Sequence, residues 1–312
     1  MDNLVRKMVR STYDIQELRI ATGLRVVAQF RDRFGTEEAA TEEDRDAEQK
    51  KQDKLLKQIK LAYDRVTDGI ADNVRNKKYK FDNILTSPSE IYFVEQYLKL
   101  LNEEEDSFKR LERSLKEVPF YTEYLSKIRG IGPAMAGVLI SELDPYRAKY
   151  PSSFWKYAGL DVVAVFDKES PHDLLRTEGR GRREHHLVNS EYKDKNGDTK
   201  TKRGLSYNPW LKAKLLAVLA ASFLRANNEQ YVPIYQNYKL RMLNRPELQD
   251  NKAIKAIAHK RALRYMIKMF LQDLHIAWRA FENLEVTIPY AEAKLGIFHG
   301  RDISAQREPT AA

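Results

Sequence analysis

The chain has 312 residues, 42% of them hydrophobic, which is enough material for two folded domains or one large one. It contains no cysteine, so disulfides, thiolate metal sites and cysteine nucleophiles are excluded, and its six histidines are too scattered to suggest a zinc site. No apolar run approaches the roughly 18 residues that cross a membrane, and the N-terminus lacks the apolar core of a signal peptide, so we expect a cytoplasmic protein without a membrane partner.

The net charge of +9 is unevenly distributed along the chain. Pro171 to Arg225 contains 12 Lys and Arg against 6 Asp and Glu, and Lys252 to Arg279 contains 7 against 1, so the remainder is slightly acidic. Positive charge gathered in this way is typical of a surface that binds a polyanion such as nucleic acid. The alternative is a solvated face on a basic protein.

The first 120 residues are predicted to form a helical arm. Apolar residues at helical spacing predict a helix over Asn3–Phe34, ended by Gly35. The charged run 36–60 becomes apolar-periodic only near Leu55. It is therefore interpreted as a linker that leads into a second helix, which lasts to about Ile70.

A third helix is predicted to begin at Ser87-Pro88-Ser89-Glu90, which combines an N-cap serine, a proline in the first turn and an acidic residue three positions on. It continues from Ile91 to about Glu117 with one apolar stripe, while its other faces are charged. This is the pattern of a coiled-coil arm, and we expect the arm to mediate homo-oligomer formation. A short helix is expected after Pro119.

Residues 121–299 are predicted to form a second, mainly helical domain, followed by a tail at 300–312. The pair Asn196-Gly197 is a strong tight-turn signal and predicts a β-hairpin or an ordered flap. Helices resume at Asn208-Pro209, and the segment 253–284 shows an apolar stripe at helical spacing. A separate basic ridge on this last helix is free to face a ligand and consists of Lys260, Arg264 and Lys268.

The stretch KIRGIGPAMAGVLISEL, residues 127–143, places two glycines one residue apart between helical segments, with a proline directly after them. This is the pattern of a helix-hairpin-helix. Glycine permits a very tight turn, and the amides of Gly130, Ile131 and Gly132, with the free donors at the start of the next helix, can bind a DNA phosphate. The alternative is a glycine-rich turn between two packed helices. The predicted fold class is mainly α: a helical arm plus a helix-hairpin-helix domain with a small β-hairpin or flap.

Three stretches in order, IRGIGPAMAGVLISEL, YPSSFWKYAGLDV and TKRGLSYNPWLKAKLLAVLAASFLRA, resemble the C-terminal domain of the DEDD-type insertion-sequence transposases, the bridge-RNA-guided recombinases. The resemblance covers roughly Ile128 to Trp278, about half of the chain, and depends on the order and spacing of the motifs. It implies DNA as the partner, transposition or recombination as the process, and a structured RNA as a further ligand.

The catalytic parts of that family are only partly matched. The resemblance implies an N-terminal RuvC-like nuclease domain with four metal-binding carboxylates, but residues 1–120 are predicted to be helical and show no such set. A separate nuclease subunit would then have to supply the carboxylates. The resemblance also implies a catalytic serine in the loop after the Y-A-G-L turn, and Ser170 is the only serine there; alternatively, Ser170 only starts a turn with Pro171. Ser206 is interpreted as the cap of the helix that follows it.

A basic group lies in and after this loop. The sequence GRGRR, residues 179–183, combines glycines that allow close backbone approach with guanidiniums suited to bidentate phosphate contacts. The residues predicted to contact nucleic acid, besides the glycine turn, are Arg180, Arg182, Arg183, Lys202, Arg203, Lys212, Lys214, Lys260 and Arg264. Three aromatic residues among them are either base-stacking or packing residues: Tyr192, Tyr207 and Trp210. If His185 and His186 lie on a strand they point to opposite faces, so no metal site is expected.

The predicted function is therefore that of a DNA-binding protein of transposase or recombinase type without its own nuclease domain. The alternatives are an active serine-dependent recombinase that works with a partner nuclease subunit, and a non-catalytic oligomeric scaffold. The sequence identifies no cofactor.

Overall fold

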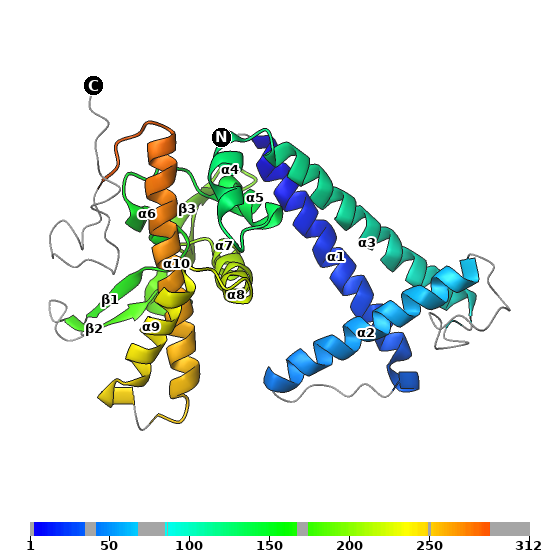
Figure 1. Cartoon of the computed structure of the whole chain (residues 1–312). Coiled ribbons are helices and arrows are strands. Elements are labelled where there is room, and N and C mark those ends of the chain that lie inside the picture. Colours follow the sequence, from blue (N-terminus) through cyan, green and yellow to red (C-terminus); the bar gives the residue numbers. More distant parts are fainter. Residues whose placement is uncertain are drawn as a thin grey trace. The chain divides into compact units, whose positions relative to one another are not determined.

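The computed structural model describes residues 3–34, 42–67, 85, 87–166, 174–248 and 251–287. The chain divides into two compact units, one spanning Asp2–Ser114 and the other beginning at Leu115. The described chain is mostly helical, as predicted (Figure 1). In the part of the chain that the structure describes, no helix is both long and apolar enough to cross a bilayer. The predicted tail, 300–312, lies outside the described residues.

The described part of the first unit contains three helices: α1 (Asn3–Phe34), α2 (Glu42–Thr67) and α3 (Pro88–Leu115). All three contribute to one apolar core, which contains Val26, Val27, Phe30, Leu55, Ile59, Ala62, Val94, Tyr97 and Leu98. The predicted bounds of α1 are confirmed. The linker prediction is wrong for residues 42–54, which are helical, because a run of Glu, Gln, Lys and Ala has high helix propensity even without an apolar stripe.

The start of α3 has the predicted capping box. The backbone N–H of Glu90 donates to Ser87 Oγ, and the backbone N–H of Ser87 donates to Glu90 Oε2, both at 3.3 Å. Further along α3, Glu104 is buried and accepts hydrogen bonds from Gln16 Nε2 at 2.8 Å and Arg19 Nε at 2.6 Å. This pairing fixes the register of α3 against α1, because a shift of one turn would leave a buried carboxylate without its partners.

The second unit combines short helices, one long helix and two small sheets. Its helices are α4 (Pro119–Glu123), α5 (Pro133–Glu142), α6 (Pro151–Tyr157), α7 (Pro209–Ala213), α8 (Ala220–Arg225), α9 (Val232–Leu243) and α10 (Ile254–Phe281). A π-helical segment, Lys214–Leu219, joins α7 to α8, so the helix predicted after Asn208 is continuous. Single 3-10 turns occur at Leu125–Lys127, Glu184–His186 and Pro246–Leu248.

Both sheets of this unit are antiparallel pairs: β1 (Val162–Phe166) with β2 (Leu174–Gly179), and β3 (Leu187–Lys193) with β4 (Thr199–Leu205). The β3–β4 pair is the predicted hairpin. Gly197 takes φ +87° in its turn, and the side chain of Asp194 accepts two backbone N–H groups there. The β1–β2 sheet is an addition to the predicted fold, because the continuous apolar run of β1 has no alternating pattern that marks a strand.

Helix α10 is the centre of the second unit and packs against α6, α8 and α9 (Figure 1). Its predicted apolar stripe is confirmed as core. The buried rings of Phe223, Tyr231 and Phe270 form one cluster, in which Phe223 and Tyr231 stack with ring centroids 4.8 Å apart. This packing fixes which side of α10 carries the basic ridge.

Candidate nucleic-acid interface

The glycine turn at 130–132 lies directly before α5. Gly130 has φ +98°, which strains other residues, and a Cβ there would lie 2.9 Å from the buried ring of Phe223. Ile131 is buried, whereas Gly132 is exposed and has no atom within 4 Å of the position a Cβ would take. The turn is therefore held on one side and open on the other.

Two carbonyl groups at this turn accept hydrogen bonds from side chains in α8 and just after it. Ser222 Oγ donates to the carbonyl of Gly130 at 2.7 Å, and Asn228 Nδ2 donates to the carbonyl of Arg129 at 2.6 Å. The N–H of Ile131 is used within the turn, at 3.0 Å. Because the N–H and C=O of a trans peptide point to opposite sides, the bond to Arg129 directs the N–H of Gly130 away from Asn228.

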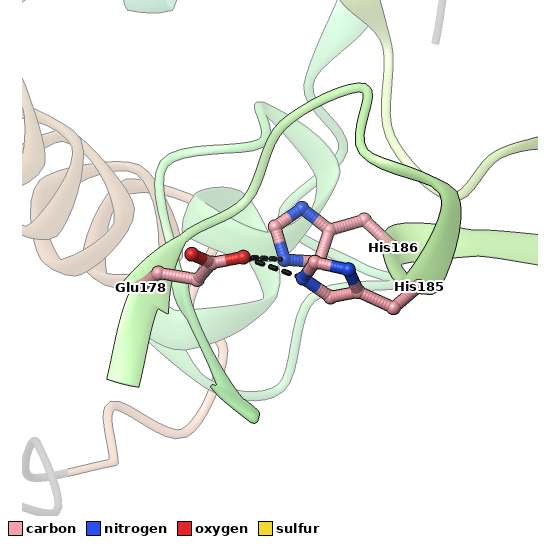
Figure 2. Close-up of side chains that lie close together, drawn as sticks. All are labelled: Glu178, His185 and His186. Atoms are coloured by element: carbon pink, nitrogen blue, oxygen red, sulfur yellow. Dashed lines mark hydrogen bonds and ion pairs between the residues drawn. The ribbon is translucent and has the colours of Figure 1, made fainter. Parts of the chain in front are cut away.

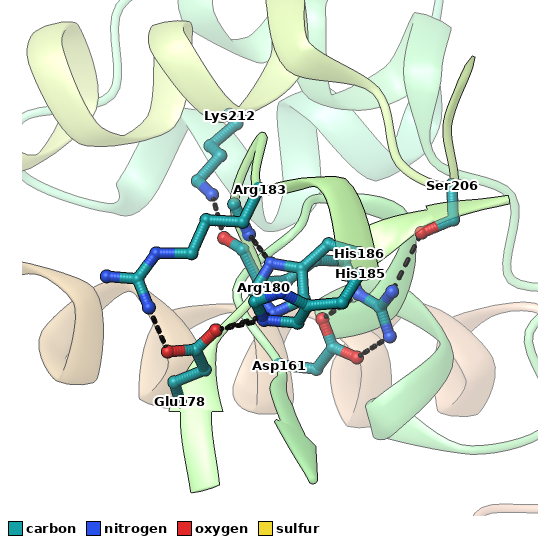
Figure 3. Close-up of polar contacts among 9 residues, drawn as sticks. Asp161, Glu178, Arg180, Arg183, His185, His186, Ser206 and Lys212 are labelled. Atoms are coloured by element: carbon teal, nitrogen blue, oxygen red, sulfur yellow. Dashed lines mark hydrogen bonds and ion pairs between the residues drawn. The ribbon is translucent and has the colours of Figure 1, made fainter. Parts of the chain in front are cut away.

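The guanidinium of Arg180 donates hydrogen bonds to other side chains of the protein, so it is not free to contact a ligand (Figure 3). Its Nε and Nη2 donate to the two oxygens of Asp161 at 2.8 Å each, and its Nη1 donates to Ser206 Oγ at 2.8 Å. The hydrogen bonds to Asp161 raise the pKa of Arg180. Ser206 is therefore not the helix cap that the sequence predicted; Asn208 takes that role and accepts from the backbone N–H of Leu211 at 3.0 Å.

Three further cations surround the same carboxylate. Lys212 on α7, and Arg264 and Lys268 on α10, all feel the charge of Asp161. We name Asp161, Arg180, Lys212, Arg264 and Lys268 the cation cluster. Among the described residues of the cluster one carboxylate interacts with four positively charged side chains, so the cluster has a net positive charge.

Lys212 shows the effect of this crowding most clearly. Burial, followed by the charge of Arg264, lowers the pKa of Lys212 to about 8. Its Nζ donates to the carbonyl of Arg180 at 2.6 Å and lies 4.6 Å from the ring centroid of Tyr207. Figure 3 shows Lys212 reaching toward Arg180 from the helix above it. The ammonium group is thus held near the GRGRR loop, in surroundings that destabilise its charged form relative to the neutral amine.

Arg264 and Lys268 are covered more deeply. Burial lowers the pKa of both side chains. The Nη1 of Arg264 is buried without a hydrogen-bond partner, and it lies so close to the backbone that a Cβ on Gly179 would be 2.1 Å away. The Nζ of Lys268 lies 4.3 Å from the ring centroid of Trp155. The predicted ridge on α10 thus runs from the exposed Lys260 into the cation cluster.

The remaining predicted basic residues fall into two classes. Five are exposed, namely Arg182, Arg183, Lys202, Arg203 and Lys260, whereas Lys214 is half-buried. Two of these five pair with nearby acids, Arg183 with Glu178 and Arg203 with Glu184, the latter at 2.8 Å. The paired arginines shape the loop, while Arg182, Lys202 and Lys260 have no ion pair of this kind among the described residues and are placed to reach a ligand.

The aromatic residues among them have different environments. Tyr207 is buried against Gly159, which has φ +64° and would bring a Cβ to within 2.4 Å of the ring. Trp210 is half-buried and lies 5.5 Å from the Nζ of Lys214, whose pKa is lowered by burial. Tyr192 is 47% exposed. Of the three, only Tyr192 is exposed enough to stack on a base.

The two adjacent histidines meet one carboxylate (Figure 2). The Nε2 atoms of His185 and His186 lie 2.5 and 3.0 Å from Glu178 Oε1. The expectation that they point to opposite faces is wrong, because they lie in a 3-10 turn and not on a strand. Glu178 also pairs with Arg183, so this carboxylate ties together the GRGRR loop and the turn that follows it.

Glu178, His185 and His186 are close enough together to hold a metal ion, with their ligand atoms within 4.8 Å of one another. The hydrogen bonding of His186 does not fit that role. The backbone N–H of Gly181 donates to His186 Nδ1 at 2.9 Å, and burial lowers the pKa of His186 and so favours the neutral ring. A neutral ring that accepts at Nδ1 carries its proton on Nε2, which leaves no lone pair there for a metal. We therefore interpret the contact as a structural one.

Ser170 lies outside the described residues, so the structure does not place the predicted catalytic serine. In the described part of the chain the strands form two two-stranded sheets. Comparison of the chain with models of known protein families, with curated protein sequences and with solved structures finds no match.

Two members of the cation cluster were absent from the predicted interface. Asp161 directly follows the Y-A-G-L turn, and an acid beside a basic loop is a signal that it pairs with that loop. Lys268 was recognised as part of the α10 ridge but not as a site residue. Its position one turn beyond Arg264 was the available signal, because residues i and i+4 share a helix face.

Proposed function

We propose that this protein binds DNA through the phosphate backbone, using its second unit. The observation that carries this proposal is the cation cluster, in which Arg180 pairs with Asp161, Lys212 donates to the carbonyl of Arg180, Arg264 lies against Gly179, and Lys268 on α10 also feels the charge of Asp161. Gathering like charges in a half-buried place costs free energy, which a bound polyanion offsets. The exposed Arg182, Lys202 and Lys260 extend the positive charge to the surface.

The glycine turn supports the same function. We interpret the 3-10 turn Leu125–Lys127, the glycines and α5 as a helix-hairpin-helix. The N–H of Gly130 and the free amides in the first turn of α5 would then bind a phosphate. Contacts of this kind position a duplex and do not read its sequence.

The resemblance to the DEDD-type transposases supports DNA transposition or recombination as the process, with a separate nuclease subunit supplying the carboxylates and a structured RNA as co-ligand. Homo-oligomer formation through the arm remains a prediction. The same resemblance supports an active serine recombinase as a second candidate. A covalent protein–DNA adduct that disappears in the Ser170→Ala variant would establish it, and the absence of any adduct with a nuclease partner present would exclude it.

The test of DNA binding is its salt dependence, measured by fluorescence anisotropy with the full chain and duplex DNA of several sequences. The logarithm of the affinity should fall linearly with the logarithm of salt concentration, with a slope of about −0.9 for each phosphate contacted. Arg182→Ala and Lys260→Ala should each weaken binding to all sequences alike and reduce the slope by about 1.

Lys57→Ala is the matched control, since it removes an equally exposed charge from the first unit. It should leave both affinity and slope unchanged. An absence of binding at low salt would contradict the proposal and favour the scaffold. Equal losses in the control and in the two interface variants would show that the charge acts through the whole chain rather than at this site.

A further inference from the structure

The β3–β4 hairpin is ordered although it buries little surface. Side chains along both strands are exposed, except at the base, where they are half-buried. An isolated two-stranded hairpin is marginally stable. Here the tip is reinforced, because Asp194 Oδ1 accepts two backbone N–H groups at 2.8 and 3.1 Å and Oδ2 pairs with Lys200 at 2.5 Å. Such a ribbon presents two faces that the described chain leaves uncovered.

The strand register makes these two faces chemically different. Residues opposite each other in an antiparallel pair have side chains on the same face. The basic face consists of the pairs Val188–Gly204, Ser190–Lys202 and Tyr192–Lys200. It carries no carboxylate between the base and Asp194 at the tip. The mixed face consists of Asn189, Glu191, Lys193, Thr199, Thr201 and Arg203.

The basic face offers groups that suit the edges of base pairs. Lys202 is exposed, and lysine donates to the O6 and N7 acceptors of guanine. Ser190 is also exposed; its Oγ donates to the carbonyl of Lys202 at 3.1 Å and keeps acceptor capacity for a base donor, while the exposed ring of Tyr192 can contact apolar groups such as the thymine methyl. The mixed face is less suited to DNA because the exposed Glu191 would be repelled. One cation of each face is paired, Lys200 with Asp194 and Arg203 with Glu184, so Lys202 is the cation that the basic face offers.

We propose that the β3–β4 ribbon lies in the major groove of duplex DNA with its basic face toward the base edges; this rests on the proposed DNA binding. The major groove of B-DNA, about 12 Å wide and about 8.5 Å deep, admits a two-stranded ribbon without deformation, whereas the minor groove, about 6 Å wide, admits one only when the duplex is bent and the groove opened. Strands of seven residues, at about 3.3 Å per residue, are long enough to reach the groove floor. The deep, narrow major groove of duplex RNA excludes the ribbon, so the partner is DNA.

The experiment compares two forms of one mixed-sequence DNA duplex, unmodified and with glucosyl groups on 5-hydroxymethylcytosine, which fill the major groove. Affinity of the full chain is measured for each form by anisotropy at one salt concentration. We expect the glucosylated duplex to bind about tenfold or more weakly. Netropsin, a minor-groove ligand, should leave binding to the unmodified duplex unchanged.

The paired variants locate the effect on one face. Tyr192→Ala with Lys202→Ala should lower the affinity for unmodified DNA and remove most of the discrimination between the two duplexes. Lys193→Ala with Thr199→Ala removes the same charge from the mixed face and should keep the discrimination.

Equal binding of both duplexes by the unaltered protein, or displacement by netropsin, would overturn the major-groove inference while leaving phosphate-backbone binding intact. Loss of discrimination in the mixed-face variant would overturn the assignment of the basic face. If neither duplex binds at low salt, the proposed DNA binding fails, and the inference fails with it. The comparison of duplexes uses the unaltered protein, so it stays decisive even if a variant does not fold.

Discussion

Replacing Arg264 with methionine should stabilise the second unit and weaken its binding to DNA. Methionine keeps most of the apolar length of the side chain and removes the charge. The buried Nη1 of Arg264 has no hydrogen-bond partner, and a polar group left in that state costs about 1–3 kcal/mol. Since Arg264 as a whole is only half-buried and is attracted to Asp161, we expect a net gain of about 1 kcal/mol. That gain corresponds to a rise in Tm of roughly 2–4 °C.

Thermal unfolding followed by circular dichroism measures the gain, and the anisotropy assay measures the accompanying loss of affinity, expected to be about three- to tenfold. Lys260→Met, one turn earlier on the same face, is the matched control and should change the stability by less than about 0.5 kcal/mol. The pKa of Lys212 should also rise from about 8, because Arg264 is one cause of its lowering. A lower Tm for Arg264→Met with an unchanged control would refute the reasoning, since Arg264 would then be a net stabiliser.

Three further predictions concern the turn, the cluster and the arm. Gly130→Ala should destabilise the second unit by about 3 kcal/mol in urea unfolding, because of φ +98° and contact with a buried ring, whereas Gly132→Ala should cost less than about 1 kcal/mol. Similar losses for both would contradict this. The pKa of Lys212 is about 8 in the folded protein, against 10.5 for an ordinary lysine. Below pH 8 the side chain is charged in both the folded and the unfolded state, so the full free-energy cost of burying its charge destabilises the fold. Between those values the unfolded chain binds more protons, and stability should rise with pH by about 1 kcal/mol after discounting for solvent exposure; Lys212→Met should flatten the profile, and an unchanged profile would contradict the assignment. Glu104→Ala should destabilise the arm by about 2 kcal/mol in urea unfolding, unlike its exposed neighbour Glu105→Ala, because it leaves the half-buried Arg19 without its carboxylate partner.

The features that the sequence predicted well are those set by local chemistry. The cap at Ser87 and the turn at Asn196-Gly197 are determined by side chains within a few residues of each other. The bounds of α1 and the buried stripe of α10 follow from apolar spacing. The early start of α2 was missed because the prediction relied on the apolar period and gave no weight to the helix propensity of a charged run.

The candidate site was less predictable, because the role of each of its residues depends on partners that are distant in the sequence. The sequence GRGRR could be recognised as basic. Only the fold shows that Arg180 forms an ion pair with Asp161, which lies 19 residues earlier in the chain. The approach of Lys212 and Arg264 to that carboxylate depends on how α7 and α10 pack. For His185 and His186 the error was local, since a single 3-10 turn changed the direction of both rings.

The proposal of DNA binding depends on the distribution of pairing more than on the number of basic residues. Arg180 pairs with Asp161 and Arg183 pairs with Glu178, so the charge of these two arginines is used to hold the loop in place. In the half-buried part of the cluster, Lys212 and Arg264 share the carboxylate of Asp161 with Arg180, which already holds both of its oxygens, so among the described residues positive charge persists there at the cost of folding free energy. A chain optimised for stability alone would replace those groups by apolar ones, so their presence points to a ligand that supplies the missing negative charge.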